Sequence, residues 1–404
     1  MGFEEREAKE MVAEAGRKLL ESGLIVRTWG NISARISNDE FVITPSGKGY
    51  DTLTADDIVK VNMNDFSWEG KAKPSSEKHM HAAIYRQRLG ANFIIHTHQR
   101  YASALSSLGF VYSVYRTAPE SVPILGPEVP TAHYGISSTK MLSARVEDAI
   151  AQFPKSRAVL MQGHGAVCVG VDCDDAFRIA NALEQMAEKR YAQLLGPLMP
   201  EECAENYQDS DFYQVWLRGS GTAEGGKTSY GGMTDAAGSA DSAQNEGACC
   251  TSDGTCCSSD GKEDAIIVDS LHDQIFSEKP GVGCVIRTTT PFLKKISGFG
   301  SRMPVCIDDL AQYLGTFVPC LPADASDEDI AKALQGTAGG VLIQDGGAVC
   351  TGRDQDDAEA VCMVMEKGAM AALLKYAGHK IHTIDAVSGL LEHIVYTAKY
   401  AKLK

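Results

Sequence analysis

The sequence predicts an α/β fold that occurs twice along the chain. In the first half, segments with apolar residues at helical spacing alternate with short apolar runs that are typical of buried strands. The second half repeats part of this pattern. Between the halves, residues 219–263 are rich in Gly, Ser, Ala and Asp and contain almost no large apolar residues, which predicts a flexible linker.

Length and charge limit the classes of partner. The 404 residues are enough for two domains, and the net charge of -15 argues against a nucleic acid or an anionic membrane as partner. No apolar stretch approaches the length of a membrane span, and the acidic start MGFEEREAKEMV lacks the apolar core of a signal peptide. We therefore expect a cytoplasmic protein, and the net charge does not exclude a small anionic substrate.

The N-terminal elements come first in chain order. Residues 4–22 carry a helical apolar stripe that ends at Gly23, and Phe41–Ile43 and Ile58–Val61 are predicted as short strands. The segments 28–35 and 44–47 contain Gly, Asn, Ser and Thr beside strand ends. Such turns expose backbone N–H groups that suit an oxyanion or a phosphate, although most turns of this composition are plain turns.

The stretch 73–98 carries the densest set of reactive side chains. A helix is predicted to begin at Pro74–Glu77, with Glu77 in its first turn and with Ser75 and Ser76 either capping it or holding a phosphate. His79 and His81 of this helix are interpreted as surface or packing residues. The helix leads into an apolar strand at Phe93–Ile95, followed by two histidines. Because side chains alternate along a strand, His96 and His98 are expected to point to the same face.

A third histidine follows a second predicted strand. His164 lies in a glycine turn directly after Ala158–Met161. Segments 140–153 and 175–195 read as helices, and the proline-rich segment 110–134 reads as irregular. An isolated His-x-His pair is a weak signal, but with His164 and Glu77 it makes a plausible set of metal ligands.

Six segments of the first half together resemble the class II aldolase/adducin family, and its L-fuculose-1-phosphate aldolase branch in particular. They follow one another in the family's order and spacing within residues 5–200, and they read GNISAR, ITPSGKGYDTL, DIVKV, KPSSE, IIHTH and QGHGAVCVG. Each segment alone is unspecific, whereas the set is specific. The resemblance implies an α/β/α sandwich around a central, mainly antiparallel sheet, with residues 1–218 as the catalytic domain.

The resemblance also implies a site. A divalent ion, Zn²⁺ or another such as Mn²⁺ or Co²⁺, would be bound by His96, His98, His164 and Glu77, and Glu77 would be the catalytic base. The phosphate of the substrate would be bound by a set from three loops: Asn31, Ser46, Gly47, Ser75 and Ser76. The family uses a tyrosine of a neighbouring subunit as proton donor, for which Tyr115 is the nearest candidate, and a homo-oligomer is expected.

The implied reaction is retro-aldol cleavage of a small phosphorylated ketose to a three-carbon ketone phosphate and an aldehyde. A Lewis-acid metal stabilises the enediolate that such a cleavage generates, and a carboxylate can move the proton. Two alternatives stay open from the sequence: a sugar-phosphate epimerase or dehydratase on the same metal site, and a non-catalytic, adducin-like assembly module.

The second half is a degenerate copy. Residues 265–380 repeat residues 74–195, which predicts a second, truncated domain at 264–404. In this alignment each of the four ligands is replaced, because Val268, Arg287, Thr289 and Gly346 stand where the first copy has Glu77, His96, His98 and His164. We expect the second copy to keep the core of the fold, to lack its chemistry, and to pack on the first copy where a neighbouring subunit would lie.

Four cysteines cluster within the predicted linker, as Cys249-Cys250 and Cys256-Cys257. Vicinal cysteines around a turn could bind a soft metal or form a redox disulfide, or they could belong to an accessible disordered loop. Their spacing matches no established zinc motif.

Overall fold

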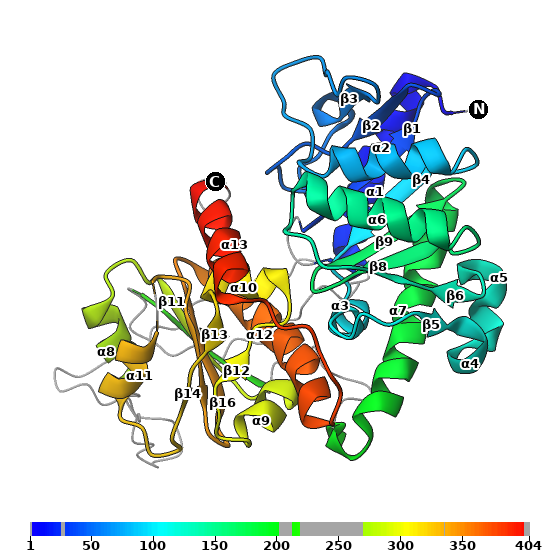
Figure 1. The fold of residues 1–404 in the computed structure, drawn as a ribbon. Helices are drawn as coiled ribbons and strands as arrows, with labels where there is room; N and C mark the ends of the chain where they lie inside the picture. The colour runs from blue at the N-terminus through cyan, green and yellow to red at the C-terminus, as the bar shows by residue number, and fades with distance from the viewer. Residues whose placement is uncertain (1, 26–28, 202–211, 219–269, 335, 400–404) are drawn as a thin grey trace, which may run out of the picture.

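The computed structural model describes residues 2–25, 29–201, 212–218, 270–334 and 336–399. We call residues 2–201 the first unit and the described residues from 212 onward the second unit. The two units lie side by side, and each is built on a sheet of its own (Figure 1). The predicted linker 219–263, with its four cysteines and Val268 beyond it, lies outside the described residues.

The first unit is an α/β/α sandwich. Its helices and strands are α1 (Glu5–Glu21), β1 (Gly30–Arg35), β2 (Glu40–Ile43), β3 (Val59–Asn62), α2 (Lys78–Gln87), β4 (Phe93–Thr97), α3 (Arg100–Ser106), β5 (Tyr112–Ser113), α4 (Val114–Thr117), α5 (Val122–Leu125), β6 (Glu128–Val129), β7 (Thr131–Ala132), α6 (Lys140–Gln152), β8 (Ala158–Met161), β9 (Gly165–Gly170) and α7 (Cys173–Leu195). Short 3-10 turns occur at Ala55–Asp57, Pro119–Ser121 and Gly196–Leu198.

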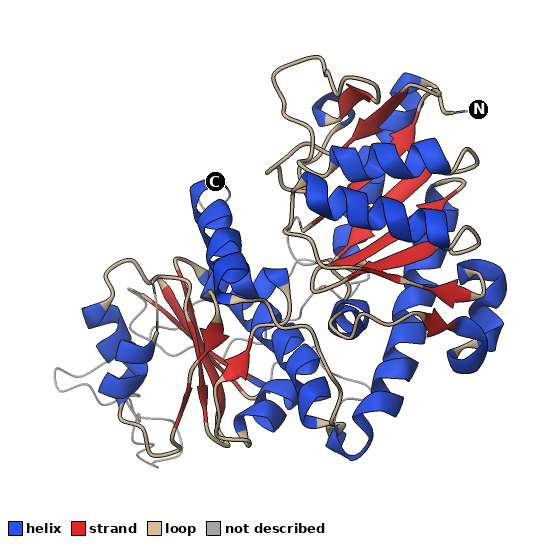
Figure 2. Cartoon of the chain, in the orientation of Figure 1, coloured by secondary structure: helices blue, strands red, loops and turns tan. Residues whose placement is uncertain are grey.

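The first sheet has the strand order β3-β2-β1-β4-β9-β8-β7, and only the β7–β8 pair is parallel. Helices α2 and α6 cover one face, with Ile84 and Val146 packed on Ile94 and Val167 of the sheet. Helices α1, α3 and α7 cover the other face (Figure 2). The mainly antiparallel sandwich implied by the sequence is therefore confirmed.

The second unit repeats the central part of this sheet. Its elements are β10 (Tyr213–Leu217), α8 (Ser270–Glu278), β11 (Cys284–Thr288), α9 (Pro291–Ser297), β12 (Met303–Pro304), α10 (Asp308–Leu314), β13 (Phe317–Val318), β14 (Cys320–Leu321), α11 (Asp327–Ala333), β15 (Gly340–Ile343), β16 (Gly347–Gly352), α12 (Gln355–Tyr376) and α13 (Ala386–Lys399). The order β10-β11-β16-β15-β14, with a parallel β14–β15 pair at the edge, is that of β1-β4-β9-β8-β7.

Strand register confirms the alignment of the two copies. Ile95 of β4 lies opposite Cys168 of β9, and Ile286 of β11 lies opposite Cys350 of β16 in the same way. Arg287 therefore occupies the position of His96. The described part of the second unit has no counterpart of β2 or β3 in its sheet, which leaves it the shorter copy.

The second copy begins earlier than residue 265. Arg218, at the end of β10, donates to the carbonyl oxygens of Val282, Phe276 and Lys279 over 2.6, 2.9 and 2.7 Å. Arg35, at the end of β1, donates to the three corresponding carbonyls in the first unit, Ala91, Tyr85 and Arg88. Strand β10 is thus the counterpart of β1 and pairs in the second sheet. We therefore propose a division before β10, in place of the end at residue 218 that was predicted for the first domain.

Three local expectations differ from the structure. Helix α2 begins at Lys78, so Glu77 is its N-cap residue and not part of its first turn. Residues 30–35, expected as a glycine turn, form the inner strand β1, because their backbone pairs with both β2 and β4. The segment 110–134, expected to be irregular, contains several short elements between β5 and β7.

The inner faces of the two units share one apolar core. Helix α12 of the second unit packs on α3, and Tyr191 of α7 donates to the carbonyl oxygen of Met370 over 2.9 Å.

Among the described helices, none has the length and apolar character needed to cross a bilayer.

In each unit a glutamate accepts N–H groups at the start of the helix that follows the central strand, namely α3 in the first unit and α9 in the second; Glu366 is buried and Glu184 is half-buried. Glu184 accepts the backbone N–H groups of Tyr101 and Ala102, and Glu366 accepts those of Phe292 and Leu293. Glu366 also accepts the hydroxyl of Thr290 over 2.6 Å. These acceptors satisfy the free N–H groups at the start of a buried helix.

Glu366→Ala should lower the free energy of unfolding by about 2–4 kcal/mol, because it leaves two N–H groups and one hydroxyl buried without an acceptor. Glu328→Ala is the control, since Glu328 is exposed and pairs with Lys332 on the surface of α11. Denaturant titration of both variants measures the difference. Equal midpoints for the two variants would contradict the role of Glu366.

Candidate metal centre

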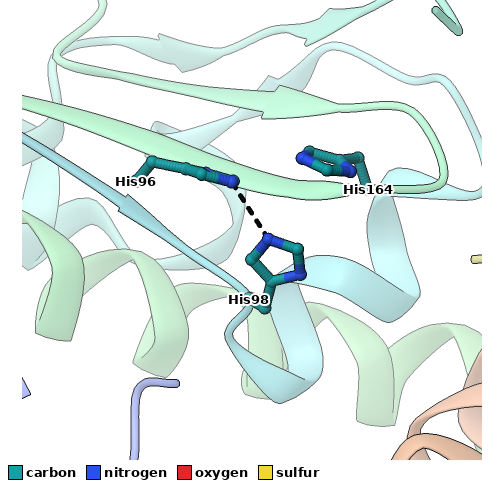
Figure 3. Close-up of side chains that lie close together, drawn as sticks. All are labelled: His96, His98 and His164. Carbon is teal, nitrogen blue, oxygen red and sulfur yellow. Dashed lines mark hydrogen bonds between the residues drawn. The ribbon is translucent and has the colours of Figure 1, made fainter. Parts of the chain in front are cut away.

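Three histidines from two segments of the first unit converge on one point. His96 lies within β4, His98 lies just beyond it, and His164 lies in the turn between β8 and β9 (Figure 3). The Nε2 atoms of His96 and His98 are 3.0 Å apart, and one nitrogen from each of the three rings lies within 4.8 Å of the others. The cluster could therefore hold a metal ion.

The pairing of β4 with β9 creates this convergence. His96 lies opposite Val167, so the turn that precedes β9 comes next to the end of β4. Gly165 permits the close approach, because a Cβ atom there would lie 2.3 Å from the carbonyl oxygen of Thr97. The spacing of His96 and His98 on one face is as the strand alternation predicts.

All three rings are oriented by a bond at Nδ1. His96 Nδ1 donates to the carbonyl oxygen of Ala166 over 2.9 Å. His98 Nδ1 is 2.8 Å from Asp309 Oδ1, and His164 Nδ1 is 3.1 Å from Asp308 Oδ2. An acceptor at Nδ1 fixes the tautomer whose Nε2 is free to bind a cation, which is the usual arrangement of metal-binding histidines.

Glu77 completes the cluster. Its Oε1 lies 3.2 Å from His164 Nε2, and its Oε2 lies 3.3 Å from His96 Nε2. Asn31 Nδ2 donates to Oε2 over 2.7 Å. Three imidazole nitrogens and a carboxylate, all buried, form a donor set that suits Zn²⁺ and other first-row divalent ions.

A buried polar chain behind Asn31 was not predicted from the sequence. His81, interpreted as a surface or packing residue, is fully buried, and its two ring nitrogens contact Asn31 Oδ1 and Ser33 Oγ over 2.5 and 2.6 Å. This contact fixes which way the Asn31 amide points, and so aims Nδ2 at Glu77. The position of His81 four residues after Glu77 on one helix was the available signal.

Burial and mutual charge shift the pKa values of the cluster. Burial alone would raise the pKa of Glu77, but the neighbouring His96 and His164 hold it well below its usual value. Burial lowers the pKa of His96 to about 3, and it lowers that of His98 as well. His164 goes the other way despite its burial, because Asp308 and Glu77 raise its pKa.

The pKa values of Asp308 and Asp309 also shift in opposite directions. Burial raises the pKa of Asp308 to about 7, against the opposing effect of His164. Burial acts on Asp309 too, but His98 and Lys367 together hold the pKa of its carboxyl below the usual value. Asp309 is therefore an anion beside His98, with Lys367 as its counterion.

The predicted phosphate loops lie next to each other. Ser46 N–H donates to the Lys73 carbonyl oxygen over 2.8 Å, and Ser75 N–H donates to that of Thr44 over 3.0 Å. Gly47 is exposed and Ser75 is buried, which leaves the loops open on one side. Ser76 Oγ lies 2.8 Å from Ser138 Oγ. Asn31, predicted to contact the phosphate, donates from Nδ2 to Glu77.

Tyr115 is not brought to the three histidines. It lies on α4, with 63% of its surface exposed, and α4 packs against α5 and α7 at the lower right of Figure 1. The turn that carries His164 lies toward the second unit, where its Gly163 carbonyl oxygen accepts the N–H of Asp308. Within one chain, the exposed Tyr115 is therefore not part of the buried cluster.

The second unit brings to the cluster three residues that were not predicted from the sequence. Asp308, Asp309 and Lys367 are all buried, and Lys367 Nζ lies 3.3 Å from the carbonyl oxygen of His98. The signal in the sequence was the acidic pair Asp308-Asp309 between Ile307 and Leu310, since adjacent carboxylates flanked by apolar residues are uncommon in a core.

Comparison with known proteins places these features in a family. The model of the "Class II Aldolase and Adducin N-terminal domain" family matches residues 10–191 and 260–373. A 5-deoxy-D-ribulose 1-phosphate aldolase of Bacillus thuringiensis serovar kurstaki is 35% identical over 208 residues, which are 50% of this chain and 93% of that protein.

Two solved structures are similar to the same part of the chain. An L-fuculose 1-phosphate aldolase is 30% identical, covering 47% of this chain and 88% of that one, with a TM-score of 0.43. The L-fuculose-1-phosphate aldolase from Thermus thermophilus is 30% identical, covering 46% and 96%, with a TM-score of 0.39. Because the family model matches both units and more than half of the residues, the chain belongs to the class II aldolase/adducin family.

Proposed function

We propose that the chain is a divalent-metal-dependent aldolase that cleaves a small phosphorylated ketose to a three-carbon ketone phosphate and an aldehyde. The observation that carries this proposal is the convergence of His96, His98, His164 and Glu77 on one buried point. Similarity to an aldolase of a ketose 1-phosphate over 93% of its length supports the substrate class.

The donor set fits a resident divalent ion such as Zn²⁺, Mn²⁺ or Co²⁺, held by the three histidine Nε2 atoms and the Glu77 carboxylate. When bound, such an ion supplies a Lewis acid that stabilises negative charge on the oxygens of the substrate. The fit rests on the three Nδ1 atoms, each of which already has an acceptor.

In this proposal Glu77 moves the proton. Its low pKa keeps it ionised at neutral pH, so it can accept a proton from a substrate hydroxyl. Asn31 donates to Oε2, and Oε1 lies beside His164 Nε2. We therefore assign the proton transfer to Oε1. As N-cap residue of α2, Glu77 is attached to the end of a helix and not within it.

We assign phosphate binding to the joined loops that carry Ser46, Gly47, Ser75 and Ser76. Their hydroxyl and N–H groups lie beside the N-terminus of α2, whose partial positive charge favours an anion. In this assignment Asn31 orients Glu77 through its hydrogen bond to Oε2 and is not counted among the phosphate ligands. Tyr115 could donate a proton only to the site of a neighbouring chain, because it is exposed on α4 and lies outside the buried cluster of its own chain.

Purified protein should contain about one divalent ion per chain, as three histidines with a carboxylate bind such ions tightly. His96→Ala/His98→Ala should abolish this content. His79→Ala is the control, since His79 lies on α2 against Phe66 and outside the cluster. Elemental analysis of the three proteins is the measurement, and full occupancy in the double variant would refute the metal centre.

Glu77→Gln should lower kcat on the preferred ketose phosphate by about 10²–10⁴-fold at saturating metal, because an amide cannot accept the proton. Glu69→Gln, at an exposed loop position, should leave kcat unchanged. A panel of ketose 1-phosphates identifies the substrate. Epimerised or dehydrated products without cleavage would favour the alternative enzymes, and bound metal without any turnover would favour an assembly module.

Ser76→Ala, alone or with Ser75→Ala, should raise KM for the phosphorylated sugar by about 10–100-fold, the loss expected for hydrogen bonds to a charged group. Cleavage of the unphosphorylated sugar should not change. Ser67→Ala, on an exposed turn, is the matched control. Equal use of free and phosphorylated sugars by the unaltered protein would show that the phosphate assignment is wrong.

A further inference from the structure

The second unit touches the candidate metal centre directly. Helix α10 begins at the turn that carries His164, where Asp308 N–H donates to the Gly163 carbonyl oxygen over 2.6 Å. This contact places the first two side chains of α10 against the metal-facing histidines. Asp308 and Asp309 are 0% and 1% exposed, so both carboxylates are enclosed by the two units together.

Asp309 is bound on both of its oxygens. Oδ1 accepts from His98 Nδ1 over 2.8 Å, and Oδ2 pairs with Lys367 of α12. Lys367 also donates to the His98 carbonyl oxygen and lies over the ring of Trp29, 5.8 Å from its centroid. A buried carboxylate is stable as an anion only when such partners compensate its lost hydration.

Asp308 serves the second histidine. Its Oδ2 lies 3.1 Å from His164 Nδ1, and its Oδ1 accepts the hydroxyl of Tyr134 over 3.2 Å. Two of the three histidines in the cluster thus take their Nδ1 partner from the second unit. Only His96 finds its partner, the Ala166 carbonyl oxygen, within the first unit.

The segment that reaches the site has a counterpart in the first unit. In the second unit α10 lies between the paired strands β12 and β13, and in the first unit α4 and α5 lie between the paired strands β5 and β6. In the second unit this strand pair follows α9 and precedes the edge strand β14, and in the first unit it follows α3 and precedes the edge strand β7. The first unit turns this segment, with Tyr115, outward, whereas the second unit inserts it into the site of the first.

The second unit has no equivalent site of its own among its described residues. Arg287, Thr289 and Gly346 stand at the positions of His96, His98 and His164. Three of the polar side chains that it buries at the interface lie against the neighbouring ligands: Asp308 and Asp309 contact His164 and His98, and Lys367 contacts Asp309 and the His98 carbonyl oxygen. The second unit therefore lacks ligands at its own equivalent site and contributes buried carboxylates to the site of the first unit.

We propose that the second unit completes the metal centre of the first, with Asp308 and Asp309 as positioning residues that orient His164 and His98 for the ion. The inference rests on the proposed metal centre and assigns part of it to the degenerate copy. Losing such a partner of a metal-binding histidine typically weakens metal binding by about 10–100-fold.

The test uses the full chain after removal of metal and titration with Co²⁺, whose visible absorption reports the ligand geometry. Asp309→Asn and Asp308→Asn should each weaken Co²⁺ binding by about 10–100-fold and should alter the absorption bands. Asp324→Asn, at an exposed turn of the same unit, is the control and should match the unaltered protein in both respects.

Asp309→Asn leaves Lys367 buried beside an amide, which could impair folding. The double variant Asp309→Asn/Lys367→Met removes both charges and carries the same expectation, as does Asp308→Asn, which leaves no lysine unpaired. Circular dichroism confirms that the compared proteins are folded.

Unchanged Co²⁺ affinity and unchanged bands in folded Asp308→Asn and in the folded double variant would overturn the inference while leaving the metal centre intact. Absence of Co²⁺ binding in the unaltered protein would instead overturn the proposed function, so the two failures are distinguishable.

Discussion

The antiparallel pairing of β4 with β9 is the interaction on which the rest of this structure depends. It places the end of one strand beside the turn that begins the other, and so brings His96, His98 and His164 together from segments about seventy residues apart. The same pairing, as β11 with β16, forms the centre of the second unit. The pairing of the backbone strands therefore brings the three ligand positions together.

Burial of charge is the second constraint. Glu77, the three histidines, Asp308 and Asp309 are each less than a tenth exposed, and every one has a polar partner. Charges removed from water are costly unless they are paired, and so the cluster tolerates few changes at any one position. Asn31 and His81 extend this pairing outward, since each is fixed by the next residue in the buried chain.

The two units retain the same structural devices and differ in chemistry. Arg35 and Arg218 each donate to three corresponding carbonyl oxygens, and Glu184 and Glu366 accept from the same two positions at the start of α3 and α9. These bonds hold helices onto the sheet and therefore stabilise each copy. The ligand positions have no such role, which is why Arg287 and Gly346 can replace histidines without disturbing the sheet.

The sequence by itself determined what depends on local spacing and on the repeat. It predicted helices α1, α2, α6 and α7, strands β2, β3, β4 and β8, the alignment of the copies, and a ligand set of three histidines and Glu77, because alternation along a strand and turns after strands are local properties. Only the tertiary structure decided which strands pair and which side chains contact one another between distant segments. It showed that β10 belongs to the second sheet, that Asn31 serves Glu77, and that Asp309 lies 2.8 Å from His98, 211 residues away along the chain. Contacts of this kind form when two surfaces pack, and no periodicity within either segment encodes them.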